Sequence, residues 1–159
     1  MKKLFSAPTT VNLELTELCN VKCRHCYNFW RDESIGHETI KNDKIDDLIA
    51  KLSVAGVFHV ILTGGEPFAN YPLLLGAIKS ISKHKMSMSV NSNLMIVTKE
   101  KLSELRSLGL DHILTSLPSP DPKLNDFIMN QKGSLDKIIS GIKIIKYSKC
   151  IFINYFANV

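Results

Sequence analysis

Two hydrophobic patterns alternate along the chain. Apolar residues at every second position, or in short unbroken runs, predict β-strands, whereas apolar residues three and four positions apart predict helices. The predicted strands cover residues 11–18, 59–63, 86–90, 112–117 and 150–159. The predicted helices cover residues 43–56, a segment opened by Pro72, residues 98–109, about 122–129 and a long segment from Ser134.

Residues that favour helix caps support these boundaries. Asn42 or Asp43 is expected to cap the first helix, because a short polar side chain can accept a hydrogen bond from an amide of the first turn. Thr98 and Ser134 are expected to cap the third and the last helix in the same way.

The order of the elements is β-α repeated, with five predicted strands joined by helical crossovers. Such alternation predicts an α/β fold with a parallel sheet. Its right-handed crossovers either wind helices around both faces or curl the sheet toward a barrel. In barrels, functional residues gather at the carboxyl ends of the strands. Because the chain stops at its fifth strand and would leave a sheet edge unpaired, we expect it to be truncated or to need a partner.

The amino-acid composition limits the broad class of protein to which the chain can belong. Hydrophobic residues make up 45% and charged residues 22% of the chain, as in an ordinary globular domain. The net charge of +5 comes from lysines and arginines spread along the chain, so no nucleic-acid partner is expected. No apolar stretch has the length of a membrane span, and no apolar signal-peptide region follows the basic start. We therefore expect a protein of the reducing cytoplasm that does not enter membranes.

Three of the four cysteines are concentrated after the first strand, in the segment "CNVKCRHCYNFW" that ends at Trp30. Cys19, Cys23 and Cys26 are spaced C-x3-C-x2-C. In a reducing compartment such a group is more often a metal site or a catalytic site than a set of disulfides. Phe29 and Trp30 either pack against this loop or fill the core, and the core is the better interpretation.

The cysteines alone leave several metals open. A structural zinc site needs four tetrahedral ligands, and His25 or His37 would have to complete the set. A closed ferredoxin-type cluster needs four thiolates, for which Cys150 is available. Cys150 is better explained as a small buried apolar residue at the opposite end of the sheet. In a third arrangement, three thiolates hold three irons of a four-iron cube and leave the fourth iron open to a substrate or cofactor.

A second stretch decides between these alternatives. "GGEP", residues 64–67, follows the second strand, one β-α unit after "CNVKCRHC", residues 19–26. In this order, and at the ends of the first two strands, the two motifs resemble those of the radical S-adenosylmethionine (radical SAM) superfamily. The similarity of pattern covers nearly the whole chain.

The resemblance implies a partial parallel (β/α)6-type barrel with about five strands present. It also implies a [4Fe–4S] cluster whose open iron is chelated by S-adenosylmethionine. The implied cluster ligands are Cys19, Cys23 and Cys26. His25 would be the aromatic residue that packs near the adenine. The methionine amino group would be received by Gly64, Gly65 and Glu66, since glycines allow close backbone approach and a carboxylate pairs with an ammonium.

The end of the third strand also resembles the family. "VNSNL", residues 90–94, is similar to the family's "TNG" or "SNG" element, so Ser92 and Asn93 are expected to face S-adenosylmethionine. Leu94 stands where that element has glycine. Ordinary strand-end chemistry also explains a polar pair at this place.

The ends of the last two strands add further candidates. "TSLPSPDP" is similar to the family's "SLDG" followed by "DP", and Ser116 matches a residue that often contacts S-adenosylmethionine. Pro118 stands where many members have Asp, so no acid role is expected there. Asn154 and Asn158 on the last strand are further candidates for contact with cofactor or substrate.

The resemblance implies an enzyme that reductively cleaves S-adenosylmethionine to a 5′-deoxyadenosyl radical. The segments "CRHCYNFWRDE" and "SLPSPDPKLNDFI" look most like members that modify peptides or proteins. A peptide or protein substrate is therefore expected, with a reductant such as flavodoxin or ferredoxin. These members often carry a C-terminal SPASM domain. We expect residues 1–159 to form the radical SAM core without its sixth β/α unit and without such a domain.

Two alternatives stay open. Within the enzyme class, the runner-up is a molybdenum-cofactor-biosynthesis-like or nucleotide-modifying radical SAM enzyme. From a different class, the chain could be a truncated, non-catalytic binding module that keeps the cluster as a structural or redox element.

Overall fold

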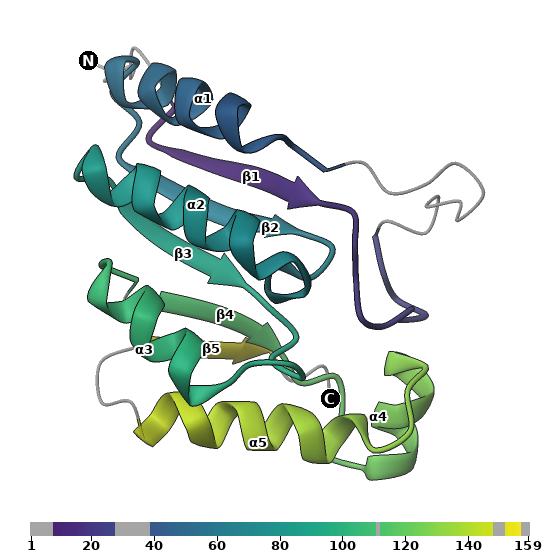
Figure 1. Cartoon of the computed structure of the whole chain (residues 1–159). Coiled ribbons are helices and arrows are strands. Elements are labelled where there is room, and N and C mark those ends of the chain that lie inside the picture. Colours follow the sequence, from purple (N-terminus) through teal and green to yellow (C-terminus); the bar gives the residue numbers. More distant parts are fainter. Residues whose placement is uncertain (1–7, 28–38, 111, 148–151, 157–159) are drawn as a thin grey trace, which may run out of the picture.

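A computed structural model of the chain describes residues 8–27, 39–110, 112–147 and 152–156 (Figure 1). The strands are β1 (Thr10–Thr16), β2 (His59–Gly64), β3 (Ser87–Asn91), β4 (His112–Ser116) and β5 (Phe152–Phe156). The helices are α1 (Asn42–Val54), α2 (Tyr71–Lys83), α3 (Lys99–Ser107), α4 (Pro122–Met129) and α5 (Ser134–Tyr147). A short 3-10 helix, η1 (Pro67–Asn70), precedes α2 and was not expected from the sequence. The predicted strands and helices are all present, with boundaries shifted by a few residues.

Some residues named in the sequence lie outside the described ranges, namely Phe29, Trp30, His37, Cys150 and Asn158. Asn154 is described only by its backbone, as part of β5. Their roles therefore stay predictions.

The strands form one parallel sheet in the order β1-β2-β3-β4-β5. Each crossover therefore moves one strand in the same direction, and right-handed crossovers of this kind place the helices on one side of the sheet. Figure 1 shows the helices on one side and all the strand arrowheads pointing the same way. The described part is thus the α/β fold predicted from the sequence, in the form that curls toward a barrel.

The face of the sheet that meets the helices is apolar. Val60, Leu62, Val90 and Ile113 are completely buried there. They form one cluster with helical side chains that are also completely buried, among them Ile49, Leu74, Ile78, Leu102 and Leu105. Burying one such side chain contributes about 1.5–3 kcal/mol. This contact therefore fixes the helices to the sheet, and with them the ends of the strands.

The opposite face of the sheet is mainly polar. Residues paired across parallel strands share a face, and His59 of β2 pairs with Ser87 of β3. The His59 ring makes hydrogen bonds with Ser87 Oγ (Nδ1, 2.9 Å) and Ser89 Oγ (Nε2, 3.0 Å). Thr63 and Asn91 continue this face toward the carboxyl ends of the same strands. The inner face of the curled sheet therefore offers hydrogen-bonding groups up to the edge near the cysteines.

The helix starts confirm one capping prediction and overturn another. Thr98 caps α3, because its Oγ1 accepts a hydrogen bond from Lys101 N at 3.3 Å. The N-cap of α1 is Lys41, which makes no side-chain cap bond. The prediction that Asn42 or Asp43 caps this helix is wrong, since both belong to its first turn. There the charge of Asp43 interacts favourably with the helix dipole instead.

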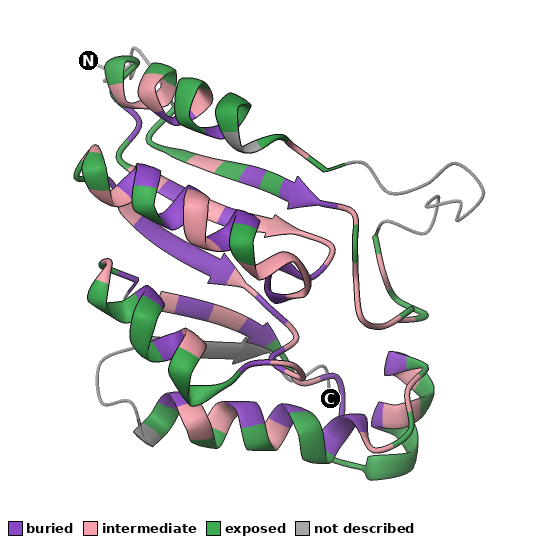
Figure 2. Ribbon diagram, in the orientation of Figure 1, coloured by how far each residue is buried: buried purple, intermediate pink, exposed green. Residues whose placement is uncertain are grey.

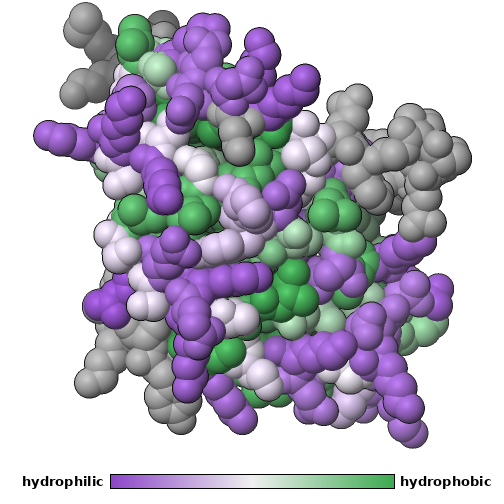
Figure 3. Space-filling view, viewed as in Figure 1, coloured by the Kyte–Doolittle hydropathy of each residue, from purple (hydrophilic) through white to green (hydrophobic). Residues whose placement is uncertain are grey.

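Hydrophilic side chains project from much of the surface seen in Figure 3, with smaller hydrophobic areas between them. Figure 2 shows the corresponding division, with exposed residues on the outer sides of the helices and buried residues toward the sheet. Within the described ranges, no helix has both the length and the apolar character needed to cross a membrane.

Candidate cofactor site at the carboxyl ends of the strands

A pocket of about 310 Å³ lies where the loop after β1 meets the carboxyl ends of β2, β3 and β4. It is lined by ten of the residues singled out in the sequence as cofactor or metal candidates: Cys19, Cys23, His25, Cys26, Gly64, Gly65, Glu66, Ser92, Asn93 and Ser116. His25 and Ser116 are exposed, so a ligand can reach both. The fold therefore brings four separate segments of the sequence to one place.

The turn after β2 fits tightly against the chain that leaves β1. Gly65 N donates a hydrogen bond to Thr16 O (2.6 Å), and Glu66 N donates one to Leu18 O (2.8 Å). A Cβ atom on Gly64 would lie 2.5 Å from Thr16 O, and one on Gly65 would collide with Leu18 O. Gly64 also has a φ of +116°, which other L-residues rarely adopt. Both glycines are therefore needed for the close approach of this turn to the start of the cysteine loop, the segment of residues 17–27 that follows β1.

Glu66 connects the same turn to the end of β3. Its side chain is completely buried. Oε1 accepts hydrogen bonds from Ser92 Oγ (2.8 Å) and Phe68 N (3.1 Å), and Oε2 accepts one from Asn93 N (2.8 Å). Burial raises the pKa of Glu66 to about 7, although these hydrogen bonds favour the ionised form and lower it. A carboxylate has about four acceptor positions, so its predicted contact with the methionine amino group stays compatible with these bonds.

Ser92 and Asn93 are held in place by further bonds. Ser92 Oγ accepts a hydrogen bond from Leu94 N (3.0 Å). Asn93 Nδ2 donates one to Asn20 Oδ1 (2.8 Å), in the cysteine loop. The end of β3 is therefore tied both to Glu66 and to the cysteine loop, and the link through Asn20 was not foreseen from the sequence.

Leu94 adopts a backbone conformation that favours glycine. Its φ is +62°, in the left-handed region, and its side chain is only 1% exposed. Gly141 of α5 provides the space, because a Cβ atom there would lie 2.5 Å from Leu94 O and 2.7 Å from Leu94 Cβ. The turn thus keeps a positive φ although leucine stands where the family element has glycine.

The thiols of Cys19, Cys23 and Cys26 are partly buried around this pocket. Burial, and then the neighbouring Cys19 and Cys26, raise the pKa of the Cys23 thiol to about 11. A bound metal would favour the thiolate form of Cys23, because metal ligands bind deprotonated. Within the described ranges, no three cysteine, histidine or carboxylate side chains meet closely enough to hold a single ion. Each cysteine of an iron–sulfur cube binds a different iron, so the three thiols of a cluster site need not converge on one ion.

Two residues that line the pocket each have a buried side-chain oxygen without a partner among the described residues. They are Asn91, whose Oδ1 belongs to the inner face of the sheet, and Thr115, whose Oγ1 belongs to the helix-facing side together with Ile113. An unsatisfied buried polar atom costs about 1–3 kcal/mol, and a ligand or water commonly completes such a group. Neither residue was singled out in the sequence. The alternation along β3 could have identified Asn91, because positions 87, 89 and 91 share the inner face.

These features fit the cofactors that the sequence implies. The three thiols are a donor set for an iron–sulfur cluster. The two glycines line the same pocket, and the unpaired Oδ1 of Asn91, on the inner face of the sheet, can accept a hydrogen bond from a polar ligand.

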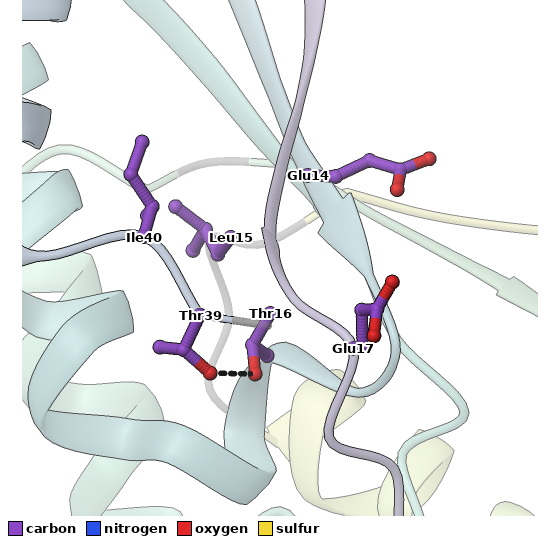
Figure 4. Close-up of a pocket in the computed structure, with 6 residues that line it drawn as sticks. All are labelled: Glu14, Leu15, Thr16, Glu17, Thr39 and Ile40. Carbon is purple, nitrogen blue, oxygen red and sulfur yellow. Dashed lines mark hydrogen bonds between the residues drawn. The ribbon is translucent and has the colours of Figure 1, made fainter. Parts of the chain in front are cut away.

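A second pocket, of about 510 Å³, lies at the end of β1 (Figure 4). It is lined by Glu14, Leu15, Thr16, Glu17, Thr39 and Ile40. The hydroxyls of Thr16 and Thr39 are 2.9 Å apart, and Ile40 N donates a hydrogen bond to Leu15 O (3.1 Å). Residues 39–40 therefore pair with the end of β1. Among the described residues the two pockets share no lining residue, and Thr16 of this second pocket is bonded through its O to Gly65 N of the first.

Comparison with known proteins supports the same interpretation. A sequence profile of the radical SAM superfamily matches residues 13–156. The PqqA peptide cyclase of Bradyrhizobium diazoefficiens is 29% identical over 134 residues, which are 82% of this chain and 34% of the cyclase. A probable GTP 3′,8-cyclase of Sulfurisphaera tokodaii is 33% identical over 136 residues, which are 84% of this chain and 41% of that protein. The chain thus spans well under half the length of these relatives.

Among solved structures, SuiB of Streptococcus suis superposes with a TM-score of 0.77 at 19% sequence identity, over 96% of this chain and 33% of SuiB. SuiB has been solved with S-adenosylmethionine bound and with its precursor peptide SuiA bound. At this identity the likeness shows a shared fold. The cofactors predicted from the sequence, a [4Fe–4S] cluster and S-adenosylmethionine, are those of the family matched by the profile. With motifs, fold and profile in agreement over most of its length, the chain belongs to the radical SAM superfamily.

Proposed function

We propose that this pocket binds a [4Fe–4S] cluster through Cys19, Cys23 and Cys26, together with S-adenosylmethionine, and that the protein uses them to modify a peptide or protein. The observation that carries the proposal is the meeting of the three thiols, the glycine turn after β2 and the unpaired acceptor Asn91 in one pocket. The cluster assignment and the substrate class are separate parts of the proposal, and each has its own test.

The chain's own groups bind and orient the cofactors. When bound, the cluster would supply the electron for reductive cleavage of S-adenosylmethionine, and with it the means to remove a hydrogen atom from the substrate. The glycine turn and Glu66 would receive the methionine amino group, and His25 would pack near the adenine. Ser92, Asn93 and Ser116, which line the same pocket at the ends of β3 and β4, would contact the cofactor from that side. Correct placement of the reacting groups carries much of the rate in such reactions.

A peptide or protein substrate is supported by a relative and by the inner face of the sheet. The PqqA peptide cyclase is 29% identical to this chain. Ser89 and Asn91 on the inner face are neutral hydrogen-bonding side chains, and Glu14 of β1 pairs in register with Thr63 on the same face. Peptide amides both donate and accept hydrogen bonds, so they suit such a surface.

A nucleotide substrate is the second candidate, because the probable GTP 3′,8-cyclase is 33% identical to the chain. A triphosphate would bring several negative charges toward the inner face, where the exposed carboxylate of Glu14 would repel them. The peptide proposal is therefore preferred.

Electron paramagnetic resonance tests the cofactor assignment. The protein is reconstituted with iron and sulfide under anaerobic conditions and reduced with dithionite, or with flavodoxin as the proposed type of physiological donor. We expect a [4Fe–4S]⁺ signal whose shape changes when S-adenosylmethionine is added. A cluster signal indifferent to this cofactor would favour the non-catalytic module, and failure to hold iron would reopen zinc.

Release of 5′-deoxyadenosine tests the substrate class. The reduced protein is incubated with S-adenosylmethionine and one probe at a time: the PqqA peptide, the SuiA peptide or GTP. We expect a peptide to increase 5′-deoxyadenosine formation and to change in mass, with GTP at the background level. Stimulation by GTP with both peptides at background would favour the nucleotide alternative.

A further inference from the structure

The cysteine loop contains neither helix nor strand, and its two halves are held by different parts of the fold. The first half is tied to the ends of β2 and β3, through Leu18 O and Asn20 Oδ1. The second half, from Cys23 onward, lies against the last turn of α4. A helix that follows β4 in the sequence therefore contributes to the metal site that follows β1.

Arg24, directly after the second cysteine, makes several contacts with this turn. Its backbone N donates a hydrogen bond to Ile128 O (2.9 Å), and its Nε donates one to Phe127 O (3.0 Å). The guanidinium carbon also lies 4.4 Å from the centroid of the Phe127 ring. Carbonyls of the last helical turn lack partners inside the helix and carry partial negative charge. A planar guanidinium can satisfy them and stack on a ring at the same time.

Met129, the last residue of α4, packs on the second cysteine itself. Its Sδ lies 3.7 Å from Cys23 Sγ, and its side chain is only 1% exposed. A buried thioether keeps water from one side of this sulfur. Access of water and hydrogen bonds to the cysteine sulfurs are among the features that set the reduction potential of iron–sulfur clusters.

The end of α4 is itself fixed to the start of α5. The Asp126 carboxylate accepts hydrogen bonds from Gly133 N (2.7 Å), Ser134 N (2.9 Å) and Ser134 Oγ (2.8 Å). The buried amide of Asn125 donates a further hydrogen bond to Ser134 Oγ (2.6 Å). The surface that contacts Arg24 is therefore anchored on α5, and α5 packs on the core through Ile145.

We propose that the last turn of α4 holds the Cys23–Cys26 half of the loop in the conformation that receives the cluster, with Arg24 as the positioning residue and Met129 as the cover of the Cys23 sulfur. The inference rests on the proposed role of these cysteines as cluster ligands. A loop that is ordered before the cluster assembles loses less conformational entropy on binding it. Arg24 therefore favours cluster binding without touching an iron.

Hydrogen exchange on the iron-free protein tests the positioning without any cofactor. Arg24→Gln removes the cation and the stacking but leaves the backbone bond possible. We expect amides of residues 23–27 to exchange about tenfold faster than in the wild type, since local opening becomes easier. Lys123→Gln removes a positive charge from an exposed position of the same helix and serves as the matched control. Equal exchange in wild type and Arg24→Gln would overturn the proposal.

The reconstituted protein gives a second readout. Loss of an outer contact of a metal site commonly weakens metal binding by about 10–100-fold, so Arg24→Gln should release iron to a chelator at least tenfold faster than Lys123→Gln. Arg24→Lys should recover part of the loss because it keeps the charge without the planar fork.

For Met129, the measurement is the midpoint potential of the cluster, determined by a redox titration that is followed by EPR. Met129→Gln should raise this midpoint potential, and Met129→Leu should leave it near the wild-type value.

These results separate the two proposals. A wild-type protein that takes up no iron would refute the cysteine assignment, whereas the exchange data would still decide whether Arg24 holds the loop. A wild-type cluster with normal iron content, together with an Arg24→Gln variant that matches it in iron release, would refute the positioning role alone.

Discussion

Leu94 in the loop after β3 fills the space that Gly141 leaves open on α5. A Cβ atom on Gly141 would lie 2.5 Å from Leu94 O, and Leu94 holds a φ of +62° with its side chain buried. A left-handed conformation costs a non-glycine residue about 1–2 kcal/mol, so the packing against α5 must offset it. Since Ser92 and Asn93 directly precede Leu94, this contact also positions the wall of the cofactor pocket.

Gly141→Ala should therefore disturb the pocket from a distance. The new methyl group would push the Leu94 backbone away, and overpacking of this kind costs about 1–3 kcal/mol. We expect a lower free energy of unfolding in urea and weaker binding of S-adenosylmethionine by calorimetry, with iron content retained. Ser140→Ala, at the exposed neighbouring position, is the control and should keep both values. Wild-type affinity in Gly141→Ala would show that the loop does not depend on α5.

Leu94→Gly would introduce the glycine of the family element, yet it should destabilise the protein. The substitution relieves the left-handed strain, worth about 1–2 kcal/mol. It also removes a completely packed leucine, whose truncation costs about 2–5 kcal/mol. Because the lost packing outweighs the relieved strain at the middle of both ranges, the expected net loss of stability is about 2 kcal/mol. Urea unfolding checks it, and a gain in stability would show that the strain outweighs the packing.

Glu66 should make stability depend on pH. Its pKa is raised from 4.5 to about 7 in the folded state, chiefly by burial. Between these values the folded protein holds this proton more tightly than the unfolded chain does, so its contribution to stability falls as pH rises. The stability of the wild type relative to Glu66→Gln should fall by roughly 3 kcal/mol from pH 4.5 to pH 7 and change little above it. Unfolding of the iron-free proteins measures this difference, and parallel pH curves would contradict the raised pKa.

Cys23→Ala should abolish cluster assembly, because Cys23 supplies one of three proposed ligands and lines the pocket. Cys150→Ala is the matched control, because Cys150 is predicted from the sequence to be a buried apolar residue and not a ligand. Cys150 itself lies outside the described residues. Iron and sulfide counting after reconstitution compares the two. Loss of iron in Cys150→Ala would mean that a fourth thiolate closes the cluster.

The substitution Asn91→Leu should weaken ligand binding without lowering the stability of the free protein. The substitution removes a buried carbonyl oxygen that has no partner among the described residues, so the free protein should be as stable as the wild type or more stable. A bound polar ligand would lose an acceptor, and S-adenosylmethionine or the peptide should bind at least several-fold more weakly. Thermal unfolding and binding titrations test the two halves. A variant that is less stable and binds normally would assign Asn91 to the fold rather than to the site.

The sequence alone determined the order of the elements and the location of the site. Apolar periodicity separates strands such as 59–63 from helices such as 43–56, because the two structures repeat at different intervals. The cysteines and the Gly64-Gly65 pair each follow a strand. Carboxyl ends of neighbouring parallel strands share one edge, so their meeting in one pocket could be predicted without coordinates.

The tertiary structure alone decided how these residues are supported. Glu66 accepts hydrogen bonds from Ser92 and Asn93, and Arg24 packs on α4. Each of these contacts joins segments that lie far apart in the sequence, and the spacing of residues along the chain does not predict them. The same holds for the space that Gly141 leaves for Leu94. A periodic pattern reports which face of an element is buried, but not which residue of another element it meets. That depends on the register and packing of the whole sheet and its helices, which only the folded chain defines.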